Sequence, residues 1–232
     1  MQWDSFTTLR NALWIGGGQW AGKTTVAGIL ADRFGLTHYH YDYHDSRGHW
    51  DRRTAAAARR GETLADPGPA ATGPRWTAEE AAADAIGCFR ERFAFVLDDL
   101  RALQSPRPIV AEGWGLRPEL VAAVTADRKR MVVLVATEGF RQLQIARLPR
   151  AAALSRPVAD PEGAQRHRVA RDRLIAADAV ASARRRGIRV IEVDGSRDAE
   201  GVADMVAGQF AEFLPAAEKP TTAATADGGP RR

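Results

Sequence analysis

Two hydrophobic periodicities alternate along this chain. Short, nearly continuous apolar runs predict buried strands over residues 11–15, 109–113, 131–137 and 188–193, and the alternating stretch 36–42 predicts another strand that ends at Asp42. Between the runs, apolar residues recur at the three- and four-residue spacing of helices. Because strands and helices take turns, the pattern predicts an α/β fold with a five-stranded parallel sheet between two layers of helices.

Local signals place the helices between these strands. Lys23 to Phe34 is predicted to be helical, with Gly35 as its stop, and Thr77 with Glu80 forms a capping box before a long helix that ends ahead of Pro106. Three more helices are expected, near 51–60, in a stretch that reaches about Arg185, and over a last amphipathic segment that includes Val202 and Phe213.

The length of 232 residues suits one substantial core, and we take residues 1–214 as one domain. Residues 215–232 are small, polar and rich in Pro and Gly, which predicts a flexible tail. Residues 43–75 are polar and end in a Gly- and Pro-rich stretch, and long loops of this kind are often functional covers.

The charge pattern favours small anionic ligands over nucleic acid. The formal net charge is +4, and Lys23, Lys129 and Lys219 are the only lysines, so the basic residues are nearly all arginine, which suits bidentate contacts with phosphate. Acidic residues are interspersed among them, and no basic face with interleaved aromatic residues appears. Cys88 is alone, which excludes an internal disulfide. With no apolar run near ~20 residues, we expect a soluble cytoplasmic protein without membrane contact.

The strongest chemical signal is the segment GGGQWAGKTT, residues 16–25. Gly17, four further residues, Gly22, Lys23 and Thr24 match the phosphate-loop pattern GxxxxGK[ST], and the match lies between a predicted strand and a predicted helix. The glycines let backbone N–H groups turn inward, Lys23 can reach the β- and γ-phosphates, and Thr24 can ligate Mg²⁺. The predicted nucleotide contacts in the loop are Gly17, Gly18, Gln19, Trp20, Ala21, Gly22, Lys23, Thr24 and Thr25.

Around this loop the chain resembles the small-molecule and nucleotide kinase group of the P-loop superfamily, which includes shikimate, gluconate and nucleoside monophosphate kinases and chloramphenicol phosphotransferase. A guanine-reading NKxD motif is absent, which disfavours a GTPase switch, and the chain is short for a large mechanical ATPase. The resemblance covers residues 11 to about 214, with HYHYD, VAEGWG, the Arg-rich segment 141–173 and VIEVDGS in the expected places. It implies the strand order 2-3-1-4-5, ATP and Mg²⁺ as cofactors, and segment 141–173 as a lid.

Residue roles follow from the same resemblance. Asp42 is expected to be the general base that positions the acceptor hydroxyl, with Asp45 as its rival, and Glu112 to lie within reach of Mg²⁺ or its waters. The lid candidates are Arg147, Arg150, Arg168 and Arg171, of which we assign Arg147 and Arg171 to catalysis and Arg168 to the nucleotide. Gly195 and Ser196 are expected near adenine, and the predicted acceptor contacts are His44, Asp45, Glu112, Gly113 and Trp114.

Four histidines, at positions 38, 40, 44 and 49, raise the alternative of a metal site. His38 and His40 alternate onto one strand face, but zinc requires three or four ligands of defined geometry, and no partner pair stands at helical spacing. We therefore prefer a substrate contact for His44 or His49, with ordinary packing as the other interpretation.

The leading hypothesis is an ATP- and Mg²⁺-dependent kinase that phosphorylates a hydroxyl of a small metabolite or natural product. A second hypothesis is a nucleotide-binding regulatory ATPase that has no small-molecule acceptor. A narrower third one, based on fold analogy, is a kinase that inactivates an antibiotic. The sequence names neither the acceptor nor the oligomeric state.

Overall fold

The computed structural model describes residues 7–62, 76–103, 105, 107–125, 127–148 and 160–215. Its centre is a parallel sheet of five strands in the order β2-β3-β1-β4-β5, as the resemblance implied. Each neighbouring pair of strands is parallel. The strands are β1 (Leu13–Gly17), β2 (Thr37–His40), β3 (Ile109–Glu112), β4 (Met131–Ala136) and β5 (Arg189–Val193).

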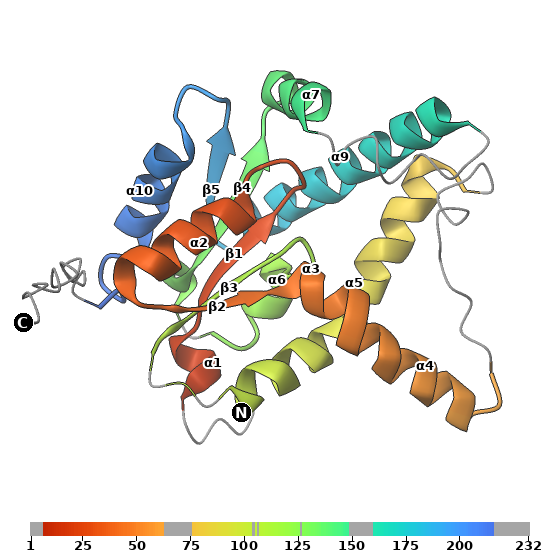
Figure 1. The fold of residues 1–232 in the computed structure, drawn as a ribbon, viewed down its shortest axis with the longest axis horizontal. Coiled ribbons are helices and arrows are strands. Elements are labelled where there is room, and N and C mark those ends of the chain that lie inside the picture. The colour runs from red at the N-terminus through yellow and green to blue at the C-terminus, as the bar shows by residue number, and fades with distance from the viewer. Residues whose placement is uncertain are drawn as a thin grey trace, which may run out of the picture.

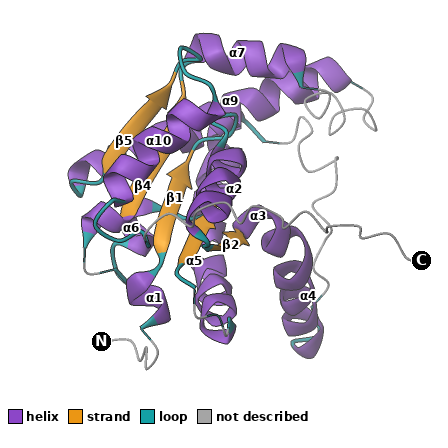
Figure 2. Ribbon diagram, turned by 60° about the vertical axis from the view of Figure 1, so that its left-hand side comes forward, coloured by secondary structure: helices purple, strands orange, loops and turns teal. Residues whose placement is uncertain are grey.

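Helices cover both faces of the sheet (Figures 1 and 2), so the predicted three-layer α/β fold is confirmed. One face of the sheet is covered by α1 (Thr8–Asn11), α5 (Ala78–Ala102), α6 (Pro118–Val121) and α9 (Pro161–Arg185). The other face is covered by α2 (Lys23–Phe34) and α10 (Ala199–Phe210). The remaining helices are α3 (Tyr41–His44), α4 (Trp50–Arg59) and α7 (Glu138–Arg147), with a π-helical turn η1 (Asp45–His49) and a 3₁₀ turn η3 (Arg128–Arg130).

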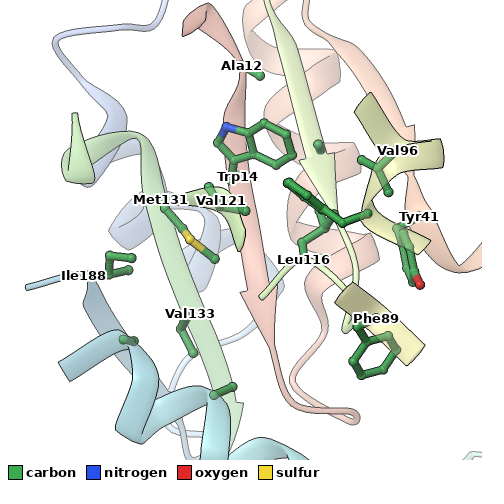
Figure 3. Close-up of a cluster of buried hydrophobic side chains, with 14 of the residues drawn as sticks. Ala12, Trp14, Tyr41, Phe89, Val96, Leu116, Val121, Met131, Val133 and Ile188 are labelled. Atoms are coloured by element: carbon green, nitrogen blue, oxygen red, sulfur yellow. The ribbon is translucent and has the colours of Figure 1, made fainter. Parts of the chain in front are cut away.

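Two apolar clusters make the core because successive side chains of a strand point to opposite faces of the sheet. In β1, Trp14 joins the cluster under α5 and α9, whereas Leu13 and Ile15 join the cluster under α2 and α10. Figure 3 shows Trp14 in the first cluster with Met131 from β4. All residues of β1, β3 and β4 are buried, which explains their continuous apolar runs.

The chain leaves the sheet earlier than predicted after β2. The strand was expected to continue to Asp42, but Tyr41 already begins α3, so Asp42 lies in the first turn of a helix. Tyr41 is buried against the turn after β3, where a Cβ on Gly115 would lie 2.3 Å from its ring. This packing turns the chain across the end of the sheet. Residues 43–59 are then helical, and the second half of the predicted cover, residues 63–75, lies outside the described residues.

Other expected elements differ by a few residues or fall outside the described part. The first strand was expected over 11–15, but Asn11 ends α1 and the strand is Leu13–Gly17. Segment 141–173 contains the end of α7 and the start of α9, while residues 149–159, including Arg150, lie outside the described residues. The same holds for residues 216–232 of the predicted tail. None of the described helices is long and apolar enough to cross a membrane.

The end of β1 tolerates no side chain at Gly17. Its φ is 117°, and an added Cβ would lie 2.1 Å from the carbonyl oxygen of Leu134 in the adjacent strand. We expect Gly17→Ala to lower the free energy of unfolding by about 3 kcal/mol or more, because backbone of two buried strands must separate. Urea denaturation measures this change.

Gly28→Ala is the matched control for this substitution. Gly28 lies inside α2, and an added Cβ there meets no atom within 4 Å. Alanine is the better helix former by roughly 1 kcal/mol, so the control should be as stable as the native protein or more so. Equal losses in both variants would contradict the steric explanation.

Candidate active site

The phosphate-loop sequence folds as a loop between β1 and α2. Its backbone takes left-handed φ angles at Trp20 (69°) and Gly22 (74°) as well as the 117° of Gly17. Nζ of the buried Lys23 donates a hydrogen bond of 2.7 Å to the carbonyl oxygen of Gly18, so the ammonium group lies across the loop. The N-terminus of α2 adds partial positive charge at the same place. This arrangement can bind phosphate oxygens through backbone N–H groups and one ammonium group.

Two oxygen ligands suited to magnesium meet at the start of α2. Thr24 Oγ1 donates a hydrogen bond of 3.1 Å to Oε1 of Glu112, which ends β3 and is fully buried. The other carboxylate oxygen, Oε2, is buried and has no hydrogen-bond partner among the described residues. Magnesium prefers hard oxygen ligands and usually keeps several waters beside one or two carboxylates and substrate phosphates. The hydroxyl, the carboxylate and its unused oxygen therefore fit the ion that the sequence implied.

Two histidines from β2 lie against this carboxylate. The register of β2 on β3 sets His40 opposite Glu112, and His40 Nδ1 is 2.7 Å from Oε1, with His38 Nε2 at 3.7 Å from the same atom. Burial opposes ionisation of Glu112, but the two histidines and the charge of Lys23 outweigh it and lower its pKa to about 2. The contact with Glu112 also raises the pKa of His40, although burial opposes the rise.

Sequence reasoning missed this role for the histidines. Their alternation correctly placed both side chains on one face of a strand, but the strand beside them could not be read from the sequence. Within the described part of the chain, no three His, Cys, Asp or Glu side chains form a group that could hold a metal ion.

Asp42 lies beyond the loop, in the first turn of α3. Burial raises the pKa of this carboxyl group above its ordinary value, and the charge of Lys23 opposes the rise. The atom Oδ1 is buried without a hydrogen-bond partner among the described residues. A Cβ on Gly113 would lie 3.1 Å from that atom, so the glycine lets the turn after β3 approach the carboxylate. Asp42 is therefore held close to the loop with an unused acceptor atom.

A cavity of about 330 Å³ opens beside Asp42, and we call it the acceptor cavity after the role proposed for it below. Three carboxylates and two guanidinium groups face it, together with two indole rings. Its lining residues are Gln19, Trp20, Asp42, Asp45, Ser46, Trp114, Arg168, Arg171 and Asp172. Five of the residues singled out beyond the loop, Asp42, Asp45, Trp114, Arg168 and Arg171, are thus brought together although they come from three separate parts of the chain.

A second cavity of about 600 Å³ shares Trp20 with the first, and we call it the nucleotide cavity after the role proposed for it below. It is bounded by Ala21, Gly22 and Thr25 of the loop and by residues of α7 and of the turn after β5. Arg147 and Gly195 line it, with Phe140 and Val193 as apolar neighbours. Ser196 is not among the lining residues, and its hydroxyl instead donates a hydrogen bond of 2.6 Å to Oδ1 of Asp194.

Trp20 is the wall that the two cavities share. It lines both, is buried to 6% exposure, and holds a left-handed φ that is uncommon for a bulky residue. The guanidinium group of Arg168 lies over its ring at 5.4 Å from the centroid. The sequence left open whether this residue faces a ligand or packs against the sheet, and its position borders both cavities.

The candidate arginines divide between the two cavities. Arg147, assigned to catalysis, lines the nucleotide cavity, and Arg168, assigned to the nucleotide, lines the acceptor cavity with Arg171. Within the expected lid segment 141–173, the described residues belong to α7 and α9, which contact each other through Glu138 and Arg173 at 3.2 Å. Asp172 lines the acceptor cavity as well, and its only signal in the sequence is its place next to Arg171.

Four of the residues expected to contact the acceptor do not line this cavity. His44 stacks on Tyr39 with ring centroids 4.5 Å apart, and its Nδ1 is 3.5 Å from Oδ2 of Asp99. His49 is buried with Nε2 2.7 Å from the same Asp99 oxygen. Both histidines thus hold α3 and η1 against α5 and do not line the acceptor cavity. Glu112 and Gly113 are also absent from its lining, because Glu112 is buried beneath the phosphate loop.

Comparisons with known proteins add little to this geometry. No protein-family model and no curated protein matches the sequence. Among solved structures, the chain is similar to the unliganded crystal structure of a sugar kinase from Janibacter sp. HTCC2649, at 14% identity and a TM-score of 0.41, over 88% of this chain and 97% of that chain. At that score the two folds superpose only loosely, so the function has to be argued from the side chains.

Proposed function

We propose that the protein is an ATP- and Mg²⁺-dependent phosphotransferase that moves the γ-phosphate to a hydroxyl group of a small molecule. The observation that carries the proposal is that two separate cavities are both lined by residues of one phosphate loop and share Trp20. The nucleotide cavity has apolar walls suited to a base, whereas the acceptor cavity contains a carboxylate next to the loop. A protein that only binds or hydrolyses nucleotide has no need of the second cavity.

The chain's own groups supply positioning and charge. Nζ of Lys23 now donates to Gly18 and is within reach of a phosphate that displaces this bond. The carboxylate of Asp42 orients the acceptor hydroxyl and accepts its proton as the oxygen attacks phosphorus. Arg168 and Arg171, on one face of α9, lie where they can stabilise charge on the transferring group. Bound ATP supplies the phosphoryl group, and bound magnesium, held by Thr24 and Glu112, supplies charge at its oxygens.

The experiment that tests the proposal measures ADP release with and without a library of hydroxylated metabolites. Stimulation by one acceptor, with the appearance of its phosphorylated form in mass spectrometry, supports a kinase. Tight nucleotide binding without stimulation by any compound supports the regulatory ATPase. Changed drug tolerance of cells that express the protein would support the narrower hypothesis of an antibiotic-inactivating kinase.

A prediction about His40 follows from its contact with Glu112. We expect His40→Ala to raise the Mg²⁺ concentration needed for half-maximal binding of a non-hydrolysable ATP analogue by about tenfold, because partners that orient a metal ligand typically contribute this much. His40→Asn keeps an N–H donor and should restore part of the affinity. Calorimetric titration at several Mg²⁺ concentrations measures both variants.

His38→Ala serves as the graded control in the same titration. Because its Nε2 lies 3.7 Å from Glu112 Oε1, against 2.7 Å for His40 Nδ1, its loss should have the smaller effect. An unchanged Mg²⁺ dependence in His40→Ala would show that Glu112 needs no support from β2.

A further inference from the structure

Three of the charged groups that line the acceptor cavity already have partners of opposite charge, either in the lining or next to it. Nε and Nη2 of Arg171 lie 3.1 Å and 2.7 Å from Oδ1 of Asp172, which is 4% exposed. Nη1 of Arg92 donates a hydrogen bond of 2.9 Å to Oδ2 of Asp45, and Arg53 lies 4.0 Å from its Oδ1. These pairs leave a cavity with strong hydrogen-bonding groups and little net charge to offer a ligand.

This pairing disfavours an anionic acceptor. A guanidinium group in bidentate geometry is a strong partner for a bound carboxylate or phosphate, but Arg171 already directs two of its N–H groups to Asp172. Arg168 lies over Trp20 at the loop side of the cavity, where the transferring phosphoryl group is expected. An anion in the remaining space would face the carboxyl groups of Asp42, Asp45 and Asp172. Placing like charges side by side in a binding site is unfavourable.

The uncharged walls favour a ring. Trp114 is fixed by an edge-to-face contact with Phe89, at 4.9 Å between centroids, and Arg171 lies over its ring at 5.4 Å. Trp20 provides the second indole of the cavity. Aromatic planes bind the apolar face of a ring, whereas neighbouring carboxylate, guanidinium and amide groups satisfy hydroxyls, each of which both donates and accepts hydrogen bonds. The volume of about 330 Å³ lies at the lower end of the range for small-molecule sites.

We propose that the acceptor is an uncharged, ring-shaped polyhydroxy compound, and that Asp172 excludes anionic analogues by occupying Arg171. The inference rests on the proposed function for the role of the cavity. Two features explain the preference for a neutral ring. They are the ion pair between Arg171 and Asp172 on α9, and the indole rings of Trp20 in the phosphate loop and Trp114 in the turn after β3.

The test compares matched neutral and acidic rings by calorimetric titration of the full chain with a non-hydrolysable ATP analogue and Mg²⁺ present. The neutral probes are hexoses, pentoses and cyclitols, and each hexose is paired with its uronate and its sugar phosphate. We expect at least one neutral ring to bind about tenfold or more tightly than its acidic partners. Binding of the acidic partner with equal or higher affinity, or binding of no neutral ring, would overturn the inference.

Asp172→Asn sharpens the test because it releases Arg171 from its ion pair. The ratio of uronate to hexose affinity should rise about tenfold in this variant, which corresponds to about 1.4 kcal/mol. Asp98→Asn, on the exposed surface of α5, is the matched control and should leave the ratio unchanged. If Asp172→Asn does not fold, the comparison of neutral and acidic rings in the native protein still decides the question.

Failure of this inference can be told apart from failure of the proposed function. Binding of a neutral ring that is never phosphorylated would support the inference about the ligand and contradict the proposal that the protein is a kinase. A carboxylate or phosphate compound that is phosphorylated efficiently overturns the inference and keeps the kinase.

Discussion

Lys23→Met is expected to lower kcat/KM for ATP by roughly 10³-fold, because it removes the one ammonium group that lies across the phosphate loop. Nζ of Lys23 is 2.7 Å from the carbonyl oxygen of Gly18 in a buried position, so no water replaces it easily there. Methionine fills nearly the same space without charge. Steady-state ADP formation measures the loss, and circular dichroism confirms that the variant is folded.

Lys129→Met is the control for the loss of a lysine. Lys129 lies on the surface, where its Nζ donates a hydrogen bond of 2.9 Å to Oε1 of Glu212. Exposed ion pairs of this kind contribute little, so activity and stability should stay within measurement error of the native protein. Activity near the native level in Lys23→Met would rule out the assigned role of the loop in phosphoryl transfer.

Asp42→Asn is expected to lower kcat by about 10²- to 10³-fold, the usual contribution of a positioned general base. The KM for the acceptor should change less, because the amide keeps the shape of the side chain and one acceptor oxygen. Stability should stay equal or increase, since burial raises the pKa of Asp42 and the ionised form is therefore unfavourable in the folded protein. Loss of activity together with equal or higher thermal stability separates a catalytic role from a structural one.

The pH dependence of the free energy of unfolding provides a second comparison between the native protein and Asp42→Asn. The pKa of Asp42 is raised in the folded state, so the folded protein binds more protons than the unfolded chain between the ordinary pKa of about 3.9 and the raised value. The native protein therefore loses stability as the pH rises through this window, and Asp42→Asn does not. Denaturation of both proteins across the window should show a growing advantage for the variant.

Asp45→Asn distinguishes the two rivals for the base. Burial opposes ionisation of Asp45, but contacts with His49, Arg92 and Arg53 outweigh it and lower its pKa, which makes this carboxylate a poor proton acceptor. Its substitution removes the partner of a half-buried Arg92, so we expect lower stability. A larger loss of kcat in Asp45→Asn than in Asp42→Asn, measured for folded protein, would reverse the assignment.

The fold was predictable because its signals are local. Continuous apolar runs marked β1, β3 and β4, whose side chains are buried on both faces, and the spacing GxxxxGK[ST] placed the loop between a strand and a helix. The capping box at Thr77 and Glu80 is present as expected. By contrast, the end of β2 was misplaced, because only the contact of Tyr41 with the turn around Gly115 turns the chain into a helix before Asp42.

The glycine-rich turn between β1 and α2, the alternation of strands and helices, and the acids near the ends of β2 and β3 could all be read from the chain, since these depend on residues close together in sequence. Which side chains face one another depends on the packing of distant segments. The pairing of β2 with β3 sets His40 against Glu112, and the packing of α9 brings Arg171 and Asp172 to the same cavity as Trp20 and Trp114. Such partners come from segments far apart in the chain, and their distances follow from strand order and helix packing, which local patterns do not specify.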